Sequence, residues 1–339
     1  MKRSFVLAGL LGAVGAVGAV GQASAQSAMT VYGSIDGGIR YATNTDAAGN
    51  GKLTMTSNGT SMSNRLGFKG VEDLGGGYNA HFALESGFIN GTGALDVPNV
   101  LFNRTAIVGV GGAFGTIDVG RQYTIAAKTI ALYEPLGFRF PLSTYAVAAS
   151  AGFRFNNDVQ YGGTFGPVTV RAGYAAGEQA GSTNNGSAKA IGASYSLGSL
   201  ALGGAYTRRM LPVAAAYREN SHATVGGAYS GDVLRVAVGY ADERQETGAL
   251  DTRSRYVWLG GEYQVSPLVK VGSAYYRYKT DTAGMAGKRG TLILTSYYAL
   301  SKRSSLYAAV DRTRFDGKQV LSAAQTRQTV VSTGINHLF

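Results

Sequence analysis

Charged residues recur at alternate positions of short segments, and their spacing decides what chemistry they could perform. Arg65 and Lys69 lie four positions apart, as do His81 and Glu85. In a β-strand such residues share one face, because side chains alternate between faces with a period of two. At ~3.3 Å per residue, His81 and Glu85 are about 13 Å apart along the strand, too far for direct contact. The pattern therefore indicates a row of charges on a wet surface that could attract or repel ions, and not a catalytic pair.

Enzyme and metal chemistry find little further support. A hydrolase needs a nucleophile, a base and an orienting group within hydrogen-bond reach, and the chain has only three histidines, His81, His222 and His337. It has no cysteine and no pair of histidines at ligand spacing, and its glycine-rich turns lack a phosphate-binding GxxxxGK(S/T) motif. We predict that the protein is not an enzyme and uses no metal and no cofactor, with an outer-membrane barrel hydrolase as the alternative.

The composition restricts the class of protein further. The 339 residues carry a net charge of +11 and include 50 glycines and 21 tyrosines but six prolines. Abundant aromatic residues argue against disorder. The basic residues are dispersed and no groove-entering helix is evident, so we predict no nucleic acid partner. Alternating apolar residues over the whole length favour transmembrane strands, each with a weak signal. A soluble secreted β-protein is a rival that would extract without detergent.

The amino terminus has the features of an export signal. A basic start and an apolar run precede Ala23-Ser24-Ala25. The run is shorter than the ~20 residues of a membrane helix, and the small residues after it are typical of a cleavage site. We predict a signal peptide at 1–25 and a single membrane domain at 26–339.

Sixteen segments alternate apolar and polar residues between turn residues. Their lengths match the ~9–11 residues that a tilted strand needs to cross a bilayer. Short connections alternate with longer polar ones, such as 42–62 and 209–220, which is typical of outer-membrane barrels. The predicted strands are 29–41, 63–72, 78–89, 102–110, 115–123, 153–161, 167–176, 188–197, 200–208, 221–230, 232–242, 253–264, 268–279, 289–299, 304–314 and 329–339.

These strands must close on themselves. An unpaired backbone group costs several kcal/mol in hydrocarbon, so an open sheet edge is excluded there. We therefore predict an all-β fold, a 16-stranded antiparallel transmembrane barrel with lipid outside and a water-filled lumen inside. The longest gap, 124–152, mixes aromatic and charged residues. Because a long ordered loop is usually functional, we expect this third long loop to fold into the lumen.

The clearest apolar residues of each strand identify its lipid face, and the alternate residues then face the lumen. Leu66 and Phe68, for example, turn Arg65 and Lys69 inward. An Arg or Lys at mid-membrane on the lipid face would cost roughly 2–4 kcal/mol. The lumen-facing residues predicted in this way include Asp36, Arg40, Arg65, Lys69, His81, Glu85, Arg154, Asp158, Arg171 and Arg235.

Simple alternation predicts a lipid-facing position for two arginines, which is unfavourable for a charged side chain. It places Arg104 and Arg121 on the lipid face, which a β-bulge or a position above the hydrocarbon would excuse. It also turns Phe153 and Phe155 toward lipid.

Several motifs resemble those of the general porins of Gram-negative beta-proteobacteria over essentially the whole chain after residue 25. They are TVYGSIDGGI, SNRLGFKGVEDLGGG, FALESGF, FNRTAIVGV, GTIDVGRQYT, FRFNNDVQY, YALSKRSSLY and the terminal phenylalanine. The resemblance implies an outer-membrane homotrimer of 16-stranded barrels in which the third long loop forms an eyelet. It implies eyelet arginines at Arg65, Arg104 and Arg154 and carboxylates at Glu85 and Glu134. The loop segment YEPLGFRF departs from the family's short acidic-proline motif, so Arg139 is a further candidate outside that pattern.

The predicted function is passive diffusion of small hydrophilic solutes and ions, with a preference for small anions. Rings of Arg and Lys favour anions and carboxylates favour cations, and clustered charges in a narrow passage add their fields. The alternative is a weakly selective or cation-preferring general porin. Arginines at the barrel ends could instead bind phosphates of lipopolysaccharide, which with outer-membrane lipid is an expected partner.

Overall fold

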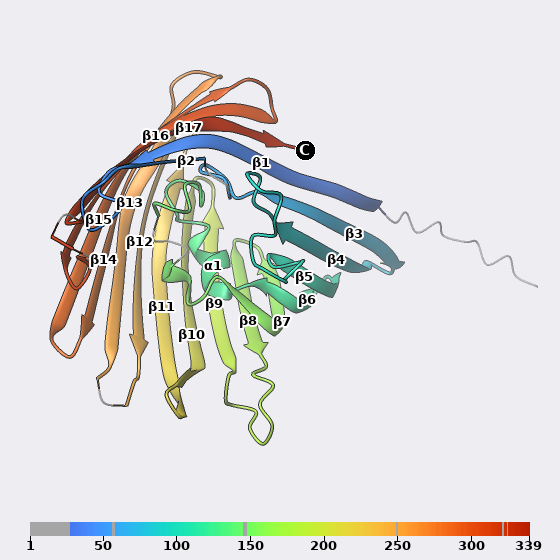
Figure 1. The fold of residues 1–339 in the computed structure, drawn as a ribbon. Coiled ribbons are helices and arrows are strands. Elements are labelled where there is room, and N and C mark those ends of the chain that lie inside the picture. The colour runs from blue at the N-terminus through green and yellow to red at the C-terminus, as the bar shows by residue number, and fades with distance from the viewer. Residues whose placement is uncertain (1–27, 56–57, 145–147, 249, 321, 324) are drawn as a thin grey trace, which may run out of the picture.

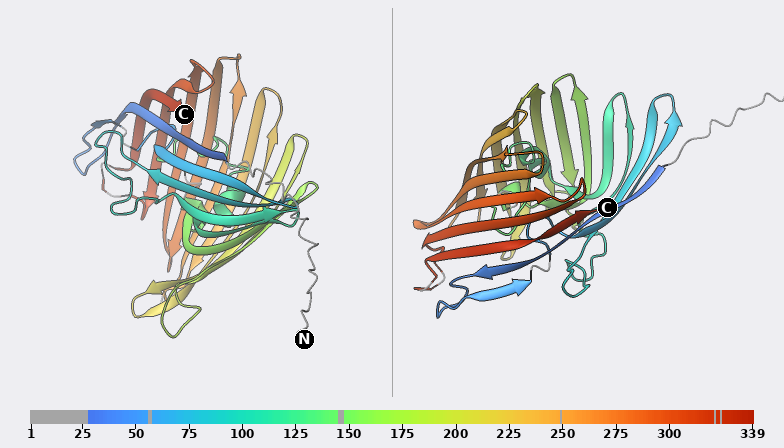
Figure 2. Two further views of the ribbon diagram at one scale, coloured as in Figure 1. Left: turned by 90° about the vertical axis from the view of Figure 1, so that its right-hand side faces the viewer. Right: turned by 90° about the horizontal axis from the view of Figure 1, so that it is seen from above.

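The computed structural model describes residues 28–339 except 56–57, 145–147, 249, 321 and 324. The predicted signal peptide lies outside these described residues. Among the helices that are described, none has the length and apolar character needed to cross a bilayer. The fold is instead built from strands, which curve round to form a wall with one short α-helix inside it (Figures 1 and 2). A 3-10 helix, Ala148–Ser150, follows later in the same connection.

Seventeen strands are present in the described part of the chain, and all their pairings are antiparallel. They are β1 (Ala28–Ala42), β2 (Lys52–Met55), β3 (Arg65–Gly75), β4 (Tyr78–Gly87), β5 (Thr105–Gly112), β6 (Gly115–Tyr123), β7 (Arg154–Phe165), β8 (Val168–Ala175), β9 (Ala188–Leu197), β10 (Leu200–Val213), β11 (Ala216–Ser230), β12 (Leu234–Gln245), β13 (Thr252–Gln264), β14 (Val269–Thr282), β15 (Met285–Ala299), β16 (Ser304–Gly317) and β17 (Arg327–Leu338).

The first strand closes the barrel. The first half of β1 pairs with β3, from Ala28 opposite Val71 to Ser34 opposite Arg65. Its second half pairs with β17. The short strand β2 adds to the free edge of that second half. The wall is therefore a closed ring of sixteen long strands, as predicted, with β2 as an extra piece within the first loop.

Each of the sixteen predicted segments corresponds to one long strand, and 115–123 and 188–197 match β6 and β9 at both ends. The predicted long loop 209–220 is wrong, because β10 and β11 extend through it to a two-residue connection. Arg209 on β10 bonds to the Asn220 side chain on β11 at 2.9 Å. Polar cross-strand pairs thus continue the ladder beyond the apolar segment.

The two faces of the wall alternate as predicted. Val31, Ile35 and Ile39 are exposed on the outer face, at 50%, 44% and 52%. Asp36, which lies between them, is fully buried on the inner side. The connection between β6 and β7 defines the loop end of the barrel, and the tight turn between β3 and β4 defines the opposite turn end.

The buried core lies inside the barrel, where the segment between β6 and β7 packs on the strands. Ile130, Tyr133, Leu136 and Phe140 of that segment are buried with residues from the inner faces of β11–β16. The strand residues of this cluster are Ala228, Ala237, Ala241, Tyr256, Trp258, Ala274, Tyr276, Ile293, Tyr297, Tyr307 and Ala309.

Candidate functional site

The segment between β6 and β7 begins with α1 (Ile125–Ile130), which lies within the curve of the strands (Figure 1). The Thr124 hydroxyl caps the helix by accepting the Ala127 N–H at 3.1 Å. It also donates to the Ser150 carbonyl at 2.9 Å, which joins the start of the segment to its end. A Cβ on Gly192 of β9 would lie 2.7 Å from the Ile125 side chain. The helix therefore packs against the wall at Gly192, where the strand has no side chain.

The chain beyond α1 is held by side chains of the wall. Arg235 of β12 donates to the carbonyls of Leu132, Glu134 and Pro135 at 3.0, 2.6 and 2.8 Å. Trp258 of β13 donates through Nε1 to the Tyr133 carbonyl at 2.9 Å. The expectation that Arg235 offers its charge to the lumen is corrected: its guanidinium is taken up by backbone carbonyls of the loop.

Glu134 is also corrected as a carboxylate that meets passing solutes, because it is 0% exposed. Its carboxylate accepts the N–H groups of Leu136 and Phe138 at 2.9 and 2.7 Å, and the Tyr276 hydroxyl. Burial raises the pKa of Glu134, and these hydrogen bonds oppose part of the rise. Glu134 therefore stabilises the conformation of the loop from a buried position.

A cavity of about 320 Å³ lies between the loop and the wall. Four basic residues line it: Arg65 from β3, Arg104 from just before β5, Lys128 from α1 and Arg139 from the loop. The other residues around it are Met62, Ser63, Tyr123, Ala127, Ala131, Gly137, Phe138, Pro141 and Phe153. No carboxylate is among these lining residues of the described chain. We call the four basic residues the waist cluster.

Glu85 lies beside the waist cluster. Arg104 Nε is 2.6 Å from Glu85 Oε1, and Arg65 Nε is 3.9 Å from Oε2. The phase problem for Arg104 is thereby resolved, because its side chain reaches the lumen residue Glu85. Strand alternation does not govern Arg104, since β5 begins one residue later, at Thr105.

Arg154 stacks on aromatic rings next to the cluster. Its guanidinium lies 4.2 Å from the centre of the Tyr123 ring and donates to the Tyr123 hydroxyl at 2.6 Å. Phe153 packs edge-on against Phe138 of the loop, with ring centres 5.5 Å apart. Its predicted lipid-facing position is therefore wrong, because β7 starts only at Arg154 and Phe153 precedes the alternation.

Arg121 lies at an irregularity of the ladder. The register between β6 and β7 shifts between Gly120 and Gln122. Arg121 donates through Nε to the Asn103 carbonyl at 2.6 Å, and it also bonds to the Asn156 side chain. A bulge thus accounts for the residue that simple alternation could not place.

Two predicted lumen residues at the first strand are engaged by other parts of the chain. The Asp36 carboxylate accepts the N–H groups of Thr60, Ser61 and Met62 at 2.9–3.1 Å and the Tyr307 hydroxyl at 2.8 Å. It fastens the first loop and is unavailable to solutes, which corrects its assignment as a pore-lining charge. Arg40 lies 3.4 Å from Asp311.

The remaining predicted residues lie in three places. His81 Nε2 is 2.7 Å from Asp118 Oδ1. The Lys69 ammonium lies 5.5 Å from the centre of the Tyr32 ring. Asp158 is buried beside Gln160. None of these three residues lines the cavity of the waist cluster.

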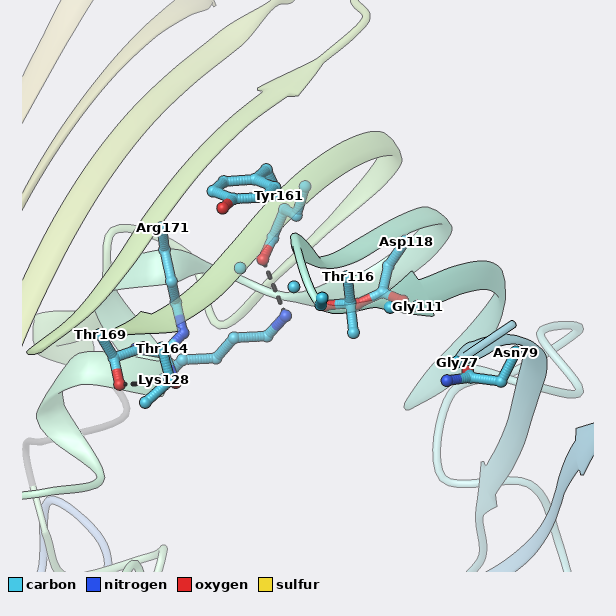
Figure 3. A pocket seen from close by; sticks show the side chains of 15 residues that line it. Gly77, Asn79, Gly111, Thr116, Asp118, Lys128, Tyr161, Thr164, Thr169 and Arg171 are labelled. Carbon is cyan, nitrogen blue, oxygen red and sulfur yellow. Dashed lines mark hydrogen bonds between the residues drawn. The ribbon is translucent and has the colours of Figure 1, made fainter. Parts of the chain in front are cut away.

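A second recess, of about 590 Å³, opens on the turn-end side of α1 (Figure 3). Lys128 and Arg171 line it, with Asp118. Lys128 Nζ donates to the Oε1 atoms of Gln122 and Gln160 at 2.9 and 2.7 Å. Burial lowers the pKa of Lys128, and the nearby aspartates oppose that effect. Lys128 lines both cavities, yet it was not among the predicted constriction residues, because nothing in its local sequence shows where α1 would dock.

Comparison with known proteins identifies the family. The family model described as Gram-negative porin matches residues 12–318. An outer membrane porin protein of Bordetella pertussis is 31% identical over 310 residues, covering 86% of this chain and 72% of the relative. The solved anion-selective porin from Comamonas acidovorans is 24% identical with a TM-score of 0.81, covering 93% of this chain and all of that one. A solved trimer form of OmpT from Vibrio cholerae is 15% identical with a TM-score of 0.70, covering 92% and 99%. The chain therefore belongs to the Gram-negative porins, the barrel proteins of the outer membrane.

Proposed function

We propose that this porin lets small hydrophilic solutes and ions diffuse passively and prefers anions. The observation that carries the proposal is the waist cluster, in which Arg65, Arg104, Lys128 and Arg139 line one cavity without a carboxylate among its lining residues. Clustered cations in a narrow, low-dielectric passage raise the local concentration of anions.

The hydrogen bonds and ion pairs of the neighbouring carboxylates also support a preference for anions. Asp36 and Glu134 are both fully buried. Their hydrogen bonds come from N–H groups of the loops and from the hydroxyls of Tyr307 and Tyr276 in the wall. Glu85 is shared between Arg65 and Arg104. One carboxylate thus partly offsets two guanidinium groups. Asp118 and Asp158 act on Lys128 only from a distance, and within the described chain neither Lys128 nor Arg139 forms a salt bridge. The similar solved structure from Comamonas acidovorans is named as anion-selective, which agrees with this sign.

The proposal is tested by the reversal potential across a planar bilayer in a KCl gradient. The wild type is expected to give an anion-selective potential. The double variant Lys128→Gln/Arg139→Gln should lose roughly fivefold in the Cl⁻ to K⁺ permeability ratio. That factor is equivalent to about 1 kcal/mol in total, when each of the two removed charges exerts about 0.5 kcal/mol on an ion at ~8 Å in water.

The matched control removes two charges far from the waist cluster. Lys302→Gln/Arg303→Gln changes an exposed turn between β15 and β16 and should leave the potential unchanged. A cation-selective wild type would contradict the anion preference without touching the family assignment.

Weak selectivity is the second candidate, and the double pairing of Glu85 favours it. If Glu85 neutralises most of the field of Arg65 and Arg104, the permeability ratio will lie near that of the free ions. Glu85→Gln distinguishes the two cases: it should raise anion preference strongly under weak selectivity, and only slightly when Lys128 and Arg139 dominate.

We also propose a homotrimer and removal of residues 1–25 on export. The trimer is supported by the trimer form of the similar Vibrio cholerae structure, and the cleavage by the small residues that end at Ala25. Native mass spectrometry of the detergent-extracted protein tests both, because it reports the number of copies and the mass of each chain.

A further inference from the structure

The recess on the turn-end side of α1 is a part of the lumen that the waist cluster leaves unexplained (Figure 3). It has a volume of about 590 Å³ and is lined mainly by residues of β4–β8, together with Lys128 of α1. Lys128 also lines the cavity of the waist cluster, so the two spaces adjoin. A solute that leaves the waist toward the turn end therefore meets this recess.

Arg171 of β8 supplies an unpaired cation to the recess. It has the strand parity of Gly173, where an added Cβ would lie 3.3 Å from the Ile125 side chain of α1, so both positions face the lumen. Within the described part of the chain, Arg171 forms no hydrogen bond and no salt bridge. Because a guanidinium group has five N–H donors and no acceptor, Arg171 can donate to an acceptor that the chain does not supply.

The strands on both sides of Arg171 carry glycine at its level. Gly192 of β9 and Gly162 of β7 lie directly opposite Arg171 in the two ladders. Gly192 makes room for the Ile125 side chain of α1. A Cβ on Gly162 would meet Thr116 Oγ1 at 3.6 Å, an ordinary contact, and Gly162 does not have a positive φ. Neither packing nor backbone conformation requires glycine at 162, so a side chain there would project into the recess.

Lys128 adds a second cation with one donor to spare. Its ammonium group has three N–H donors, and two of them bond to the side chains of Gln122 and Gln160. The charges of Lys128 and Arg171 are close enough to repel each other (Figure 3). Two neighbouring cations with unused donors favour an anion in the space between them.

The recess also presents groups that suit hydroxyls. Asp118 accepts or shares a proton at Oδ1 with His81, 2.7 Å away, and its other carboxylate oxygen forms no hydrogen bond within the described residues. Thr164 and Thr169 form a hydroxyl pair at 3.0 Å. Carboxylate oxygens accept hydrogen bonds, and hydroxyls both donate and accept. A simple inorganic anion needs donors alone and is repelled by a carboxylate, so this lining fits a solute that carries hydroxyls as well as negative charge.

We infer that the recess binds a sugar phosphate. The phosphate lies between Arg171 and Lys128 over Gly162, and the sugar hydroxyls lie against Asp118 and the threonine pair. Guanidinium and ammonium groups both bind phosphate oxygens through charge-assisted hydrogen bonds, and the volume of the recess lies within the ~300–1,000 Å³ of small-molecule sites. The inference rests on the proposed function in that solutes must enter the lumen, and it adds a site that distinguishes among anions by their hydroxyls.

Binding of glucose 6-phosphate to the detergent-solubilised full-length porin, followed by NMR titration, tests the inference. The wild type should bind it saturably. Arg171→Gln should bind roughly tenfold more weakly, the order expected when charge-assisted hydrogen bonds are lost. Gly162→Leu should also bind more weakly, because its side chain occupies the recess without changing any charge. The melting temperature shows whether Gly162→Leu is folded, and Arg171→Gln decides the question if it is not.

Lys270→Gln is the matched control for the loss of one positive charge in the lumen. Lys270 is on β14, which is not a neighbour of β8, and its ammonium lies 5.3 Å from the centre of the inner-face Tyr297 ring. This variant should bind glucose 6-phosphate as the wild type does. A loss of binding equal to that of Arg171→Gln would mean that net charge alone attracts the solute, which would overturn the inference.

Two further ligands identify what the site recognises. Glucose lacks the charge and inorganic phosphate lacks the sugar hydroxyls, so each should bind more weakly than glucose 6-phosphate. Equal binding of either ligand, or binding that is lost in Arg139→Gln and kept in Arg171→Gln, would overturn the inference. The proposed function fails by a different result, because a cation-selective reversal potential would contradict the anion preference and leave these binding measurements standing.

Discussion

Some charged side chains on the inner face of this barrel line a cavity, whereas others hold the fold together. Glu134 and Arg139 show both roles within one loop. Arg139 lines the cavity and stacks 4.6 Å from the centre of the Tyr297 ring. Glu134, five residues earlier, is buried and binds two N–H groups of its own loop. What separates a charge that acts on solutes from one that holds the fold is the set of groups around it, and that set comes from distant strands.

Glu134 gives a prediction about pH. Because burial raises its pKa in the folded protein, the folded state binds this proton more tightly than the unfolded chain does. The corresponding stability is complete below the unfolded pKa of roughly 4.3 and is lost as the pH rises through the folded value. Glu134→Gln, which stays neutral, should lack this loss. The melting temperature in detergent should therefore fall less steeply with rising pH for the variant than for the wild type. Parallel plots of melting temperature against pH for the two proteins would contradict the assignment.

At the scale of elements, the loop between β6 and β7 depends on the wall that receives it. Arg235 donates to three of its carbonyls, and Gly226 makes room for the Tyr133 ring, which would lie 2.3 Å from a Cβ there. Loop and strands therefore form one packed unit on the side of β11–β13.

Arg235→Gln should loosen this unit. The variant leaves loop carbonyls without their donor, at a cost of about 1–3 kcal/mol when they stay buried. We expect single-channel recordings with larger or fluctuating conductance and a lower melting temperature. Arg171→Gln, which removes a lumen-side charge that lines the second recess, is the matched control and should keep a steady conductance. A steady Arg235→Gln channel would mean that other contacts suffice to hold the loop.

The strands could be predicted from the sequence, because alternation and turn residues are local signals. β6 and β9 were placed to the residue. The path of the loop could not be predicted from the sequence, because its hydrogen bonds join residues far apart in the chain, such as Leu132 and Arg235. The same limit explains Lys128, which acquires its place only when α1 docks on the wall. Strand alternation predicted a lipid-facing Arg104, whereas the family resemblance predicted a position in the eyelet. The ion pair of Arg104 with Glu85 agrees with the family resemblance.

For the whole molecule, the net charge of +11 is distributed by location rather than spread evenly. Basic residues line the waist inside and also occur on the outer face near the loop end, as Arg277 and Arg314 do, while the exposed large residues on the outer face at the turn end of β13–β16 are tyrosines and aliphatic residues. The waist cluster faces the lumen, so its effect on ions should depend on the salt concentration there.

The waist cluster predicts that selectivity weakens as salt rises. The Debye length falls from about 10 Å at 0.1 M to about 3 Å at 1 M, shorter than the span of a passage lined by several side chains. At a constant concentration ratio across the bilayer, the reversal potential should therefore move toward the value for the free ions as the absolute KCl concentration increases. Selection by size alone would leave the potential unchanged, because screening does not alter the width of the passage. A potential independent of salt would thus show that the charges at the waist are not what selects the ions.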